Sequence, residues 1–125
     1  MGTQVVAVAV GGAVGCSLRY LAVVGVTRFA GTAFPWGTML VNIVGCLLAG
    51  ILFGLVQERA FFSPLIRLLL LTGFLGGFTT FSTFAVETVS LLRDGSWLVA
   101  LSSVAVNNLV GIAFALAGIY LMRVV

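Results

Sequence analysis

Residues 73–84 combine three glycines, four hydroxyl side chains and four phenylalanines within a stretch long and apolar enough to cross a membrane. Glycine weakens a helix and hydroxyl groups must be accommodated in lipid, so this mixture suits backbone that is buried in protein or lines a cavity. A helix interrupted at Gly76-Gly77 or Thr79-Thr80 would leave main-chain carbonyls free, and free carbonyls bind hard cations. The sequence therefore predicts a broken helix with cation-binding oxygens.

Two of the phenylalanines follow this point at a spacing that places them together. Phe81 and Phe84 are three residues apart, so they share one face of a helix. The edge of an aromatic ring carries partial positive charge, and two ring edges at a narrow passage could partly solvate a small anion. The alternative is that both rings face lipid or pack against other helices.

Three further polar side chains lie in apolar stretches, where they should face the protein interior or an aqueous cavity. Asn42 offers two donors and an acceptor, for an interhelical hydrogen bond or for a partly dehydrated anion. Arg19 is either a snorkelling anchor or a fixed positive charge at a pore mouth. Glu87 lies four residues before the end of its stretch, which suits the membrane interface or a vestibule.

The composition is that of an integral membrane protein. The 125 residues are 62% hydrophobic and 7% charged, with a mean hydropathy of +1.29, against roughly 25% charged residues in soluble domains. This length predicts a single domain over residues 1–125. The scattered charges do not favour nucleic-acid binding. There is no histidine, and no nucleophile–base or metal constellation is visible, so we do not expect an enzyme.

The hydropathy pattern predicts an all-α fold with four membrane-spanning helices, each of which needs about 20 mostly apolar residues. The expected spans are residues 4–25, 37–56, 66–91 and 97–121. The expected loops are residues 27–35, 57–64 and 93–96. An even number of spans places both termini on one side. The middle of the third span falls near residues 78 and 79, so the predicted break lies near the midplane.

The arginines do not favour either orientation in the membrane. They divide equally, with Arg59, Arg67 and Arg123 on the side of the termini and Arg19, Arg28 and Arg93 on the other. Cytoplasmic loops normally carry an excess of such residues, so a balance predicts insertion in both orientations. The two forms would pair as an antiparallel homodimer with a two-fold axis in the membrane plane. The alternative is that features of individual spans set one orientation.

Three runs of residues together resemble the Fluc (CrcB) family of fluoride channels. Residues 72–84 read TGFLGGFTTFSTF, which resembles the family's signature. Residues 36–45, WGTMLVNIVG, look like its second motif, and GGAVG at 11–15 leading to Arg19-Tyr20 looks like its first. The number of spans and the length also agree, so the resemblance covers essentially the whole chain.

The resemblance implies a dual-topology homodimer in a bacterial-type inner (plasma) membrane, with two pores selective for fluoride over chloride. It implies passive export that protects the cell from fluoride toxicity. It also implies a structural sodium ion (Na+) at the dimer centre, held by the main-chain carbonyls of Gly76 and Thr79 from each subunit. The implied fluoride-pore residues are Phe81, Phe84, Asn42, Ser82, Thr83, Asn107 and Ser103. Arg19 and Glu87 would act electrostatically, with Glu87 toward a vestibule.

The fourth span departs from the family pattern. Many relatives carry a tyrosine that faces the pore, followed one turn later by serine or a similar residue. Here the matching positions are Ser103 and Asn107. Asn107 can still donate a hydrogen bond, whereas the side chain of Ser103 is much smaller than that of tyrosine.

Two other functions remain as alternatives. A proton-coupled multidrug exporter of the small multidrug resistance type would share the four spans, the size and the dual topology. It needs a carboxylate in its first span, and residues 4–25 contain none. A non-transporting subunit of a larger membrane complex would have no need of a hydroxyl and phenylalanine cluster at mid-membrane.

Overall fold

The computed structural model describes residues 1–59 and 62–124, and every regular element in these ranges is helical. Four helical segments are long and apolar enough to cross a membrane: Gly2–Ala30, Trp36–Gln57, Pro64–Arg93 and Trp97–Val124. The first is helix α1 (Gly2–Ala30), and the second belongs to α2 (Trp36–Arg59). The predicted four-span all-α fold is confirmed.

The third and fourth spans are each assembled from several helical pieces. The third comprises α3 (Pro64–Arg67), η1 (Leu68–Leu75), α4 (Gly76–Phe78) and, after a break, α5 (Phe81–Arg93). The fourth comprises α6 (Trp97–Ala105), η2 (Val106–Val110) and α7 (Gly111–Val124) without a break. Both η segments have the wider π-helical turn, which is frequently found at functional sites.

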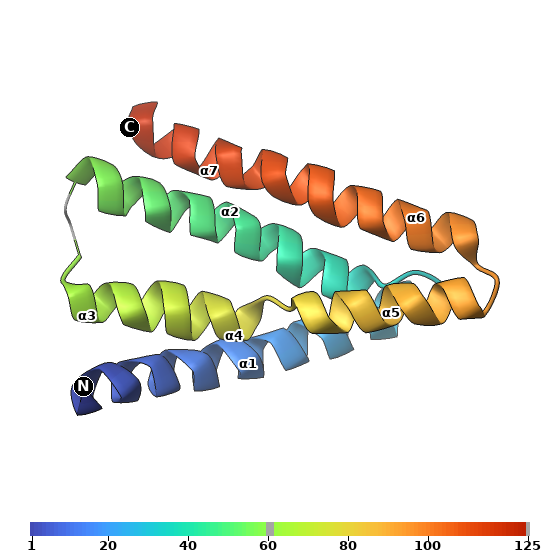
Figure 1. The fold of residues 1–125 in the computed structure, drawn as a ribbon, viewed down its shortest axis with the longest axis horizontal. Helices are drawn as coiled ribbons and strands as arrows, with labels where there is room; N and C mark the ends of the chain where they lie inside the picture. Colours follow the sequence, from blue (N-terminus) through green and yellow to red (C-terminus); the bar gives the residue numbers. More distant parts are fainter. Residues whose placement is uncertain (60–61, 125) are drawn as a thin grey trace.

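The four spans lie side by side, and both termini are at the same end of the bundle, as an even number of spans requires (Figure 1). Helix α2 packs along α7, whereas α1 packs against η1 and α4. Helix α5 meets α6 near the turn that joins them. The first half of the third span therefore belongs with α1, and the ribbons of α2 and α3 diverge toward the termini (Figure 1).

Glycines bring the backbones of these paired helices into contact. A Cβ atom on Gly15 of α1 would collide with the carbonyl oxygen of Phe74, and one on Gly77 would lie 2.7 Å from the carbonyl oxygen of Gly12. Gly50 of α2 is just as close to the backbone of Ala115 in α7. Small residues at such contacts allow close helix packing in lipid.

The boundaries differ from the predicted ones in two places. The first helix continues through Thr27-Arg28, which the sequence placed in a loop, and ends where Gly31 takes a positive φ of 78°. Arg28 in the last turn suits the negative end of the helix dipole. The second helix likewise continues through residues 57–59. The last turn agrees with the prediction, with Gly95 also at a φ of 78°.

The third span is interrupted near its middle, as predicted, but at Thr79 and Thr80 and not at the glycine pair. Gly76 has helical φ and ψ of −60° and −35°, and Gly76–Phe78 is the last helical piece before the break. Gly77 provides the close approach to α1 described above. Gly77 therefore serves helix packing, and the change of chain direction occurs at the two threonines.

Replacing Gly15 by alanine tests this packing. We expect Gly15→Ala to destabilise the protein by about 1–3 kcal/mol, because the new methyl group meets backbone that cannot yield. Gly25→Ala in the same helix is the matched control, because no other helix comes within 4 Å of its Cβ position. Thermal unfolding in detergent provides the measurement. Equal melting temperatures for the two variants would contradict this account of the contact.

Candidate functional site: a backbone break held from two sides

Two threonines form the break, and each closes one of the helices beside it. Thr79 is extended, with φ −89° and ψ 161°, and both its N–H and its Oγ1 donate to the carbonyl of Leu75, at 3.0 and 2.9 Å. Thr80, with φ −152° and ψ 113°, is the N-cap of α5. Its Oγ1 accepts from the N–H of Thr83 at 3.2 Å and donates to Thr83 Oγ1 at 2.9 Å.

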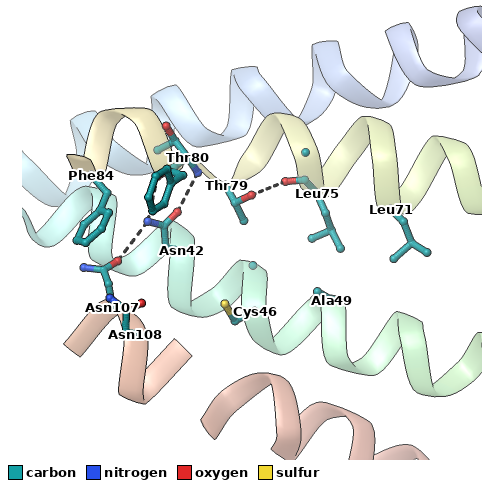
Figure 2. Close-up of a pocket in the computed structure, with 13 residues that line it drawn as sticks. Asn42, Cys46, Ala49, Leu71, Leu75, Thr79, Thr80, Phe84, Asn107 and Asn108 are labelled. Atoms are coloured by element: carbon teal, nitrogen blue, oxygen red, sulfur yellow. Dashed lines mark hydrogen bonds between the residues drawn. The ribbon is translucent and has the colours of Figure 1, made fainter. Parts of the chain in front are cut away.

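Asn42 of α2 holds the break from one side (Figure 2). Its Oδ1 accepts from the N–H of Thr80 at 2.9 Å, and its Nδ2 donates to the carbonyl of Thr80 at 3.1 Å. The same Nδ2 donates to Asn107 Oδ1 at 3.2 Å. The amide of Asn42 thus bonds to both backbone polar groups of Thr80, which a continuous helix would have paired within itself. These contacts are the interhelical hydrogen bonds that the sequence allowed as one of two roles for Asn42.

Arg19 of α1 holds the break from the other side. Its Nη1 donates to the carbonyl of Thr79 at 3.1 Å, and its Nη2 lies 3.7 Å from Cys16 Sγ. The guanidinium group is partly buried and contacts the middle of the third span. Neither position considered from the sequence, the membrane surface or a pore mouth, included this contact. The close packing of α1 on α4 makes it possible.

A groove of about 470 Å³ opens beside the break, between α2, the third span and η2. It is lined by Asn42, Gly45, Cys46, Ala49, Leu71, Leu75, Gly76, Thr79, Thr80, Phe81, Phe84, Asn107 and Asn108. We call it the central groove. Figure 2 shows Asn42 and Phe84 at one end of it and Leu71 and Ala49 toward the other.

The two predicted phenylalanines both line the central groove, but they differ in exposure. Phe84 is 8% exposed, whereas Phe81 is 79% exposed in the single chain. Their ring centroids are 5.8 Å apart and the ring planes are tilted by 52°. Ser82 and Thr83, which lie between them in the sequence, are also exposed. The structure therefore places Phe81, Ser82 and Thr83 on the outside of the single chain, whereas the ring of Phe84 is buried beside them.

Polar side chains continue from the break toward the loop end of the bundle. Asn107 Nδ2 donates to the carbonyl of Ser103 at 3.0 Å, and Thr38 Oγ1 donates to Glu87 Oε1 at 2.9 Å. Thr38 precedes Asn42 by one turn, and Ser103 precedes Asn107 by one turn. We call the six residues the polar column: Asn42, Thr80, Asn107, Ser103, Thr38 and Glu87.

Two buried atoms of the polar column have no hydrogen-bond partner, Ser103 Oγ and Glu87 Oε2. Ser103 is only 1% exposed, so its hydroxyl lies well inside the chain. Buried polar atoms are normally paired, and an unpaired one is a place where a water molecule or an ion can bind. Ser103 thus presents an unpaired hydroxyl group inside the chain.

A second cavity, of about 350 Å³, lies at the loop end of the bundle. Glu87 and Thr38 line it together with Asp94, and its wall includes the first loop and the start of α2. The structure therefore places Glu87 where the polar column meets this cavity. The position is compatible with the vestibule role expected for it.

Thr38 and Thr80 belong to the site but were not predicted as site residues. Thr38 could have been found from its spacing, because it lies one turn before Asn42 on the same face of α2. Thr80 was noted only as part of a pair, and its bonds to Asn42 depend on tertiary packing. Among the described residues no group of three His, Cys, Asp or Glu side chains could hold a metal ion. A cation here would have to bind other oxygens.

The fold and the site define a small helical membrane protein whose third span is interrupted at mid-membrane and held there by polar side chains. The family described as CrcB-like protein, Camphor Resistance (CrcB), matches residues 6–119 of the chain. The chain belongs to the CrcB family.

Relatives of high similarity carry the name fluoride-specific ion channel FluC. The Geobacter sulfurreducens protein is 47% identical over 116 residues, which cover 93% of this chain and 90% of that protein. The Rhizobium etli protein is 44% identical over 120 residues, 96% of each chain. The Maridesulfovibrio salexigens protein is 44% identical over 119 residues, 94% of each. With four spans and bacterial relatives, this is a multi-pass protein of the bacterial inner membrane.

Removing the Asn42 amide tests how the break is held. We expect Asn42→Ala to destabilise the protein by about 1–3 kcal/mol, because the N–H and carbonyl of Thr80 lose their partner inside the membrane. Amide hydrogen exchange at Thr80 should become faster at the same time. Ser17→Ala is the control, because Ser17 is exposed, lies away from the central groove and donates only to Ala13 within its own helix, at 2.7 Å. Slow exchange retained at Thr80 in Asn42→Ala would contradict the role of Asn42 in holding the break.

Proposed function

We propose that this protein is a fluoride-selective ion channel that exports fluoride passively and so protects the cell from fluoride toxicity. The observation that carries the proposal is its likeness, at 44–47% identity over nearly the whole chain, to proteins named fluoride-specific ion channels. Fluoride enters cells as neutral HF and ionises inside. A passive pore then lets the anion leave down its electrochemical gradient, helped by the inside-negative potential.

The geometry of the site supports an anion path. Fluoride is small and holds its hydration water tightly, so a pore must replace that water with hydrogen-bond donors. Ser82 and Thr83 offer hydroxyl groups beside the two phenylalanine rings, and Ser103 offers the unpaired hydroxyl of the polar column. The positive edges of Phe81 and Phe84 add a weak attraction that does not trap the ion. A narrow path of this kind disfavours chloride, which is larger.

We further propose that two copies pair as an antiparallel homodimer. In the single chain Phe81 is 79% exposed, and the exposed surface near the middle of the spans also includes Ser82, Thr83 and Asn108. Polar side chains are costly in the hydrocarbon region unless protein covers them. A second copy that sits on the central groove would cover this surface and close the open side of each anion path. The balanced arginines suit opposite orientations, and two copies give two pores.

The residues at the break fit a structural sodium ion at the centre of that dimer. In an unbroken helix the N–H of Thr80 would bond to the carbonyl of Gly76, but here it donates to Asn42. Apart from its own helix, no part of the chain comes within 4 Å of the Cβ position of Gly76, so there is open space beside it. Carbonyls of Gly76 and Thr79 from each copy would hold the ion. Sodium would neutralise the partial negative charge of these oxygens.

Fluoride efflux from liposomes that contain the purified protein tests the function. We expect rapid efflux of fluoride and little of chloride from the unmodified protein. Phe81→Ile and Phe84→Ile should each reduce fluoride efflux by roughly tenfold, since a lost aromatic contact of about 1.4 kcal/mol changes a rate by a factor of ten.

The control for these variants is Phe114→Ile in α7, which does not line the central groove. It should leave fluoride efflux within about twofold of the unmodified protein. Cross-linking in detergent reports whether each variant still pairs. Absence of fluoride efflux from the unmodified protein in sodium buffer would refute the function. Full fluoride efflux from both phenylalanine variants would show that the two rings serve packing and not fluoride conduction.

Removing sodium tests the cation site. When N-methylglucamine replaces sodium at constant ionic strength, we expect a lower melting temperature and a larger monomer fraction, because a ligand that binds only the native state stabilises it. Sodium should restore both. If potassium restored them completely at the same concentration, a site fitted to the size of sodium would be excluded.

A further inference from the structure

Two positively charged groups can bind the carbonyl oxygen of Thr79. In the proposed dimer it binds sodium, and in the single chain it accepts a hydrogen bond from Arg19 Nη1 at 3.1 Å. A carbonyl oxygen has two lone pairs, so it can accept from one cation while it coordinates another. The inference below rests on the proposed function, because it concerns the sodium ion proposed there.

Arg19 is not the only group that holds this carbonyl in place. The N–H and Oγ1 of Thr79 both bond to Leu75, at 3.0 and 2.9 Å, and these bonds fix the residue on one side. On the other side the next peptide is held by Asn42, which bonds to the N–H and carbonyl of Thr80. With the peptide already fixed, the main effect of the guanidinium on the oxygen is electrostatic.

That electrostatic effect is strong because the charge of Arg19 is not neutralised. Among the residues that the structure describes, the hydrogen-bond acceptors of its guanidinium are the Thr79 carbonyl and Cys16 Sγ, and no carboxylate forms an ion pair with it. The side chain is partly buried within a membrane span, where charges interact far more strongly than in water. A positive charge bound to the same oxygen must therefore weaken the attraction of that oxygen for sodium.

We propose that Arg19 is an internal competitor of sodium at the break. While no ion is bound, its guanidinium satisfies the carbonyl of Thr79, which would otherwise lie unpaired inside the membrane. When sodium binds, Arg19 shares or yields the oxygen, and the repulsion between the two cations raises the sodium concentration that the site requires. Arg19 therefore sets the sodium affinity of the break without binding fluoride itself.

The melting temperature in detergent, measured against sodium concentration with N-methylglucamine keeping the ionic strength constant, tests this proposal. Arg19→Gln keeps an N–H donor but removes the charge. We expect it to lower the sodium concentration for half-maximal stabilisation by about tenfold or more, from the size of charge repulsion at short range. The control is Arg28→Gln, which removes the same charge from the exposed end of the same helix. It should not move the midpoint.

Arg19→Lys provides a second test if Arg19→Gln does not assemble. Lysine keeps the charge but loses the planar fork of donors, so the sodium midpoint should stay within about twofold of the unmodified protein. A midpoint lowered in Arg19→Lys would overturn the proposal. An unchanged or raised sodium midpoint in Arg19→Gln would also overturn it. An equal loss of melting temperature in Arg19→Gln at every sodium concentration would overturn it too, because that result would indicate a packing role alone.

The outcome is separable from that for the proposed function. Fluoride efflux of the unmodified protein and of Arg19→Gln, measured at saturating sodium, reports the channel independently of the midpoint. Efflux that persists while sodium does not change the melting temperature of the unmodified protein would refute both the sodium site and the competition, and would leave the channel intact. A shifted midpoint without fluoride efflux would support the competition and refute the channel.

Discussion

Backbone groups cannot be left unpaired where there is no water, and this constraint governs the structure around the third span. The chain breaks that helix at mid-membrane and thereby removes hydrogen bonds that a continuous helix would supply. Asn42 and Arg19 replace partners of the two threonines from opposite sides. The threonine hydroxyls complete the ends of the two half-helices. A polar break is thus stable in lipid because neighbouring helices provide what the third span gives up.

The packing of the other helices follows from the need to bring these partners within reach. Gly15 and Gly77 let α1 approach the third span closely enough for Arg19 to contact the break. Helix α2 packs instead against α7, through Gly50, and its Asn42 reaches the break from the side opposite Arg19. The central groove lies beside the break, between α2 and the third span. The same arrangement that satisfies the backbone also leaves room for an occupant.

Much of this could be predicted from the sequence, because membrane spans and backbone breaks have strong local signals. Four apolar stretches and a glycine- and threonine-rich centre were sufficient for the spans and for the depth of the break. The sequence left the break open between Gly76-Gly77 and Thr79-Thr80, because the choice between glycines and threonines depends on which backbone packs against α1. The contact of Arg19 with Thr79 spans 60 residues, and no local pattern indicates it.

The order in which the chain is synthesised also affects how Arg19 and Asn42 come to hold the break. Arg19 and Asn42 belong to the first two spans, and synthesis proceeds from the N-terminus. Both side chains are therefore already in the membrane when Thr79 and Thr80 are inserted. The broken segment can then form its hydrogen bonds with Arg19 and Asn42 as it enters. Asn107, which bonds to Asn42, enters last with the fourth span. The chain order thus limits the time during which the most vulnerable peptide groups of the protein face lipid alone.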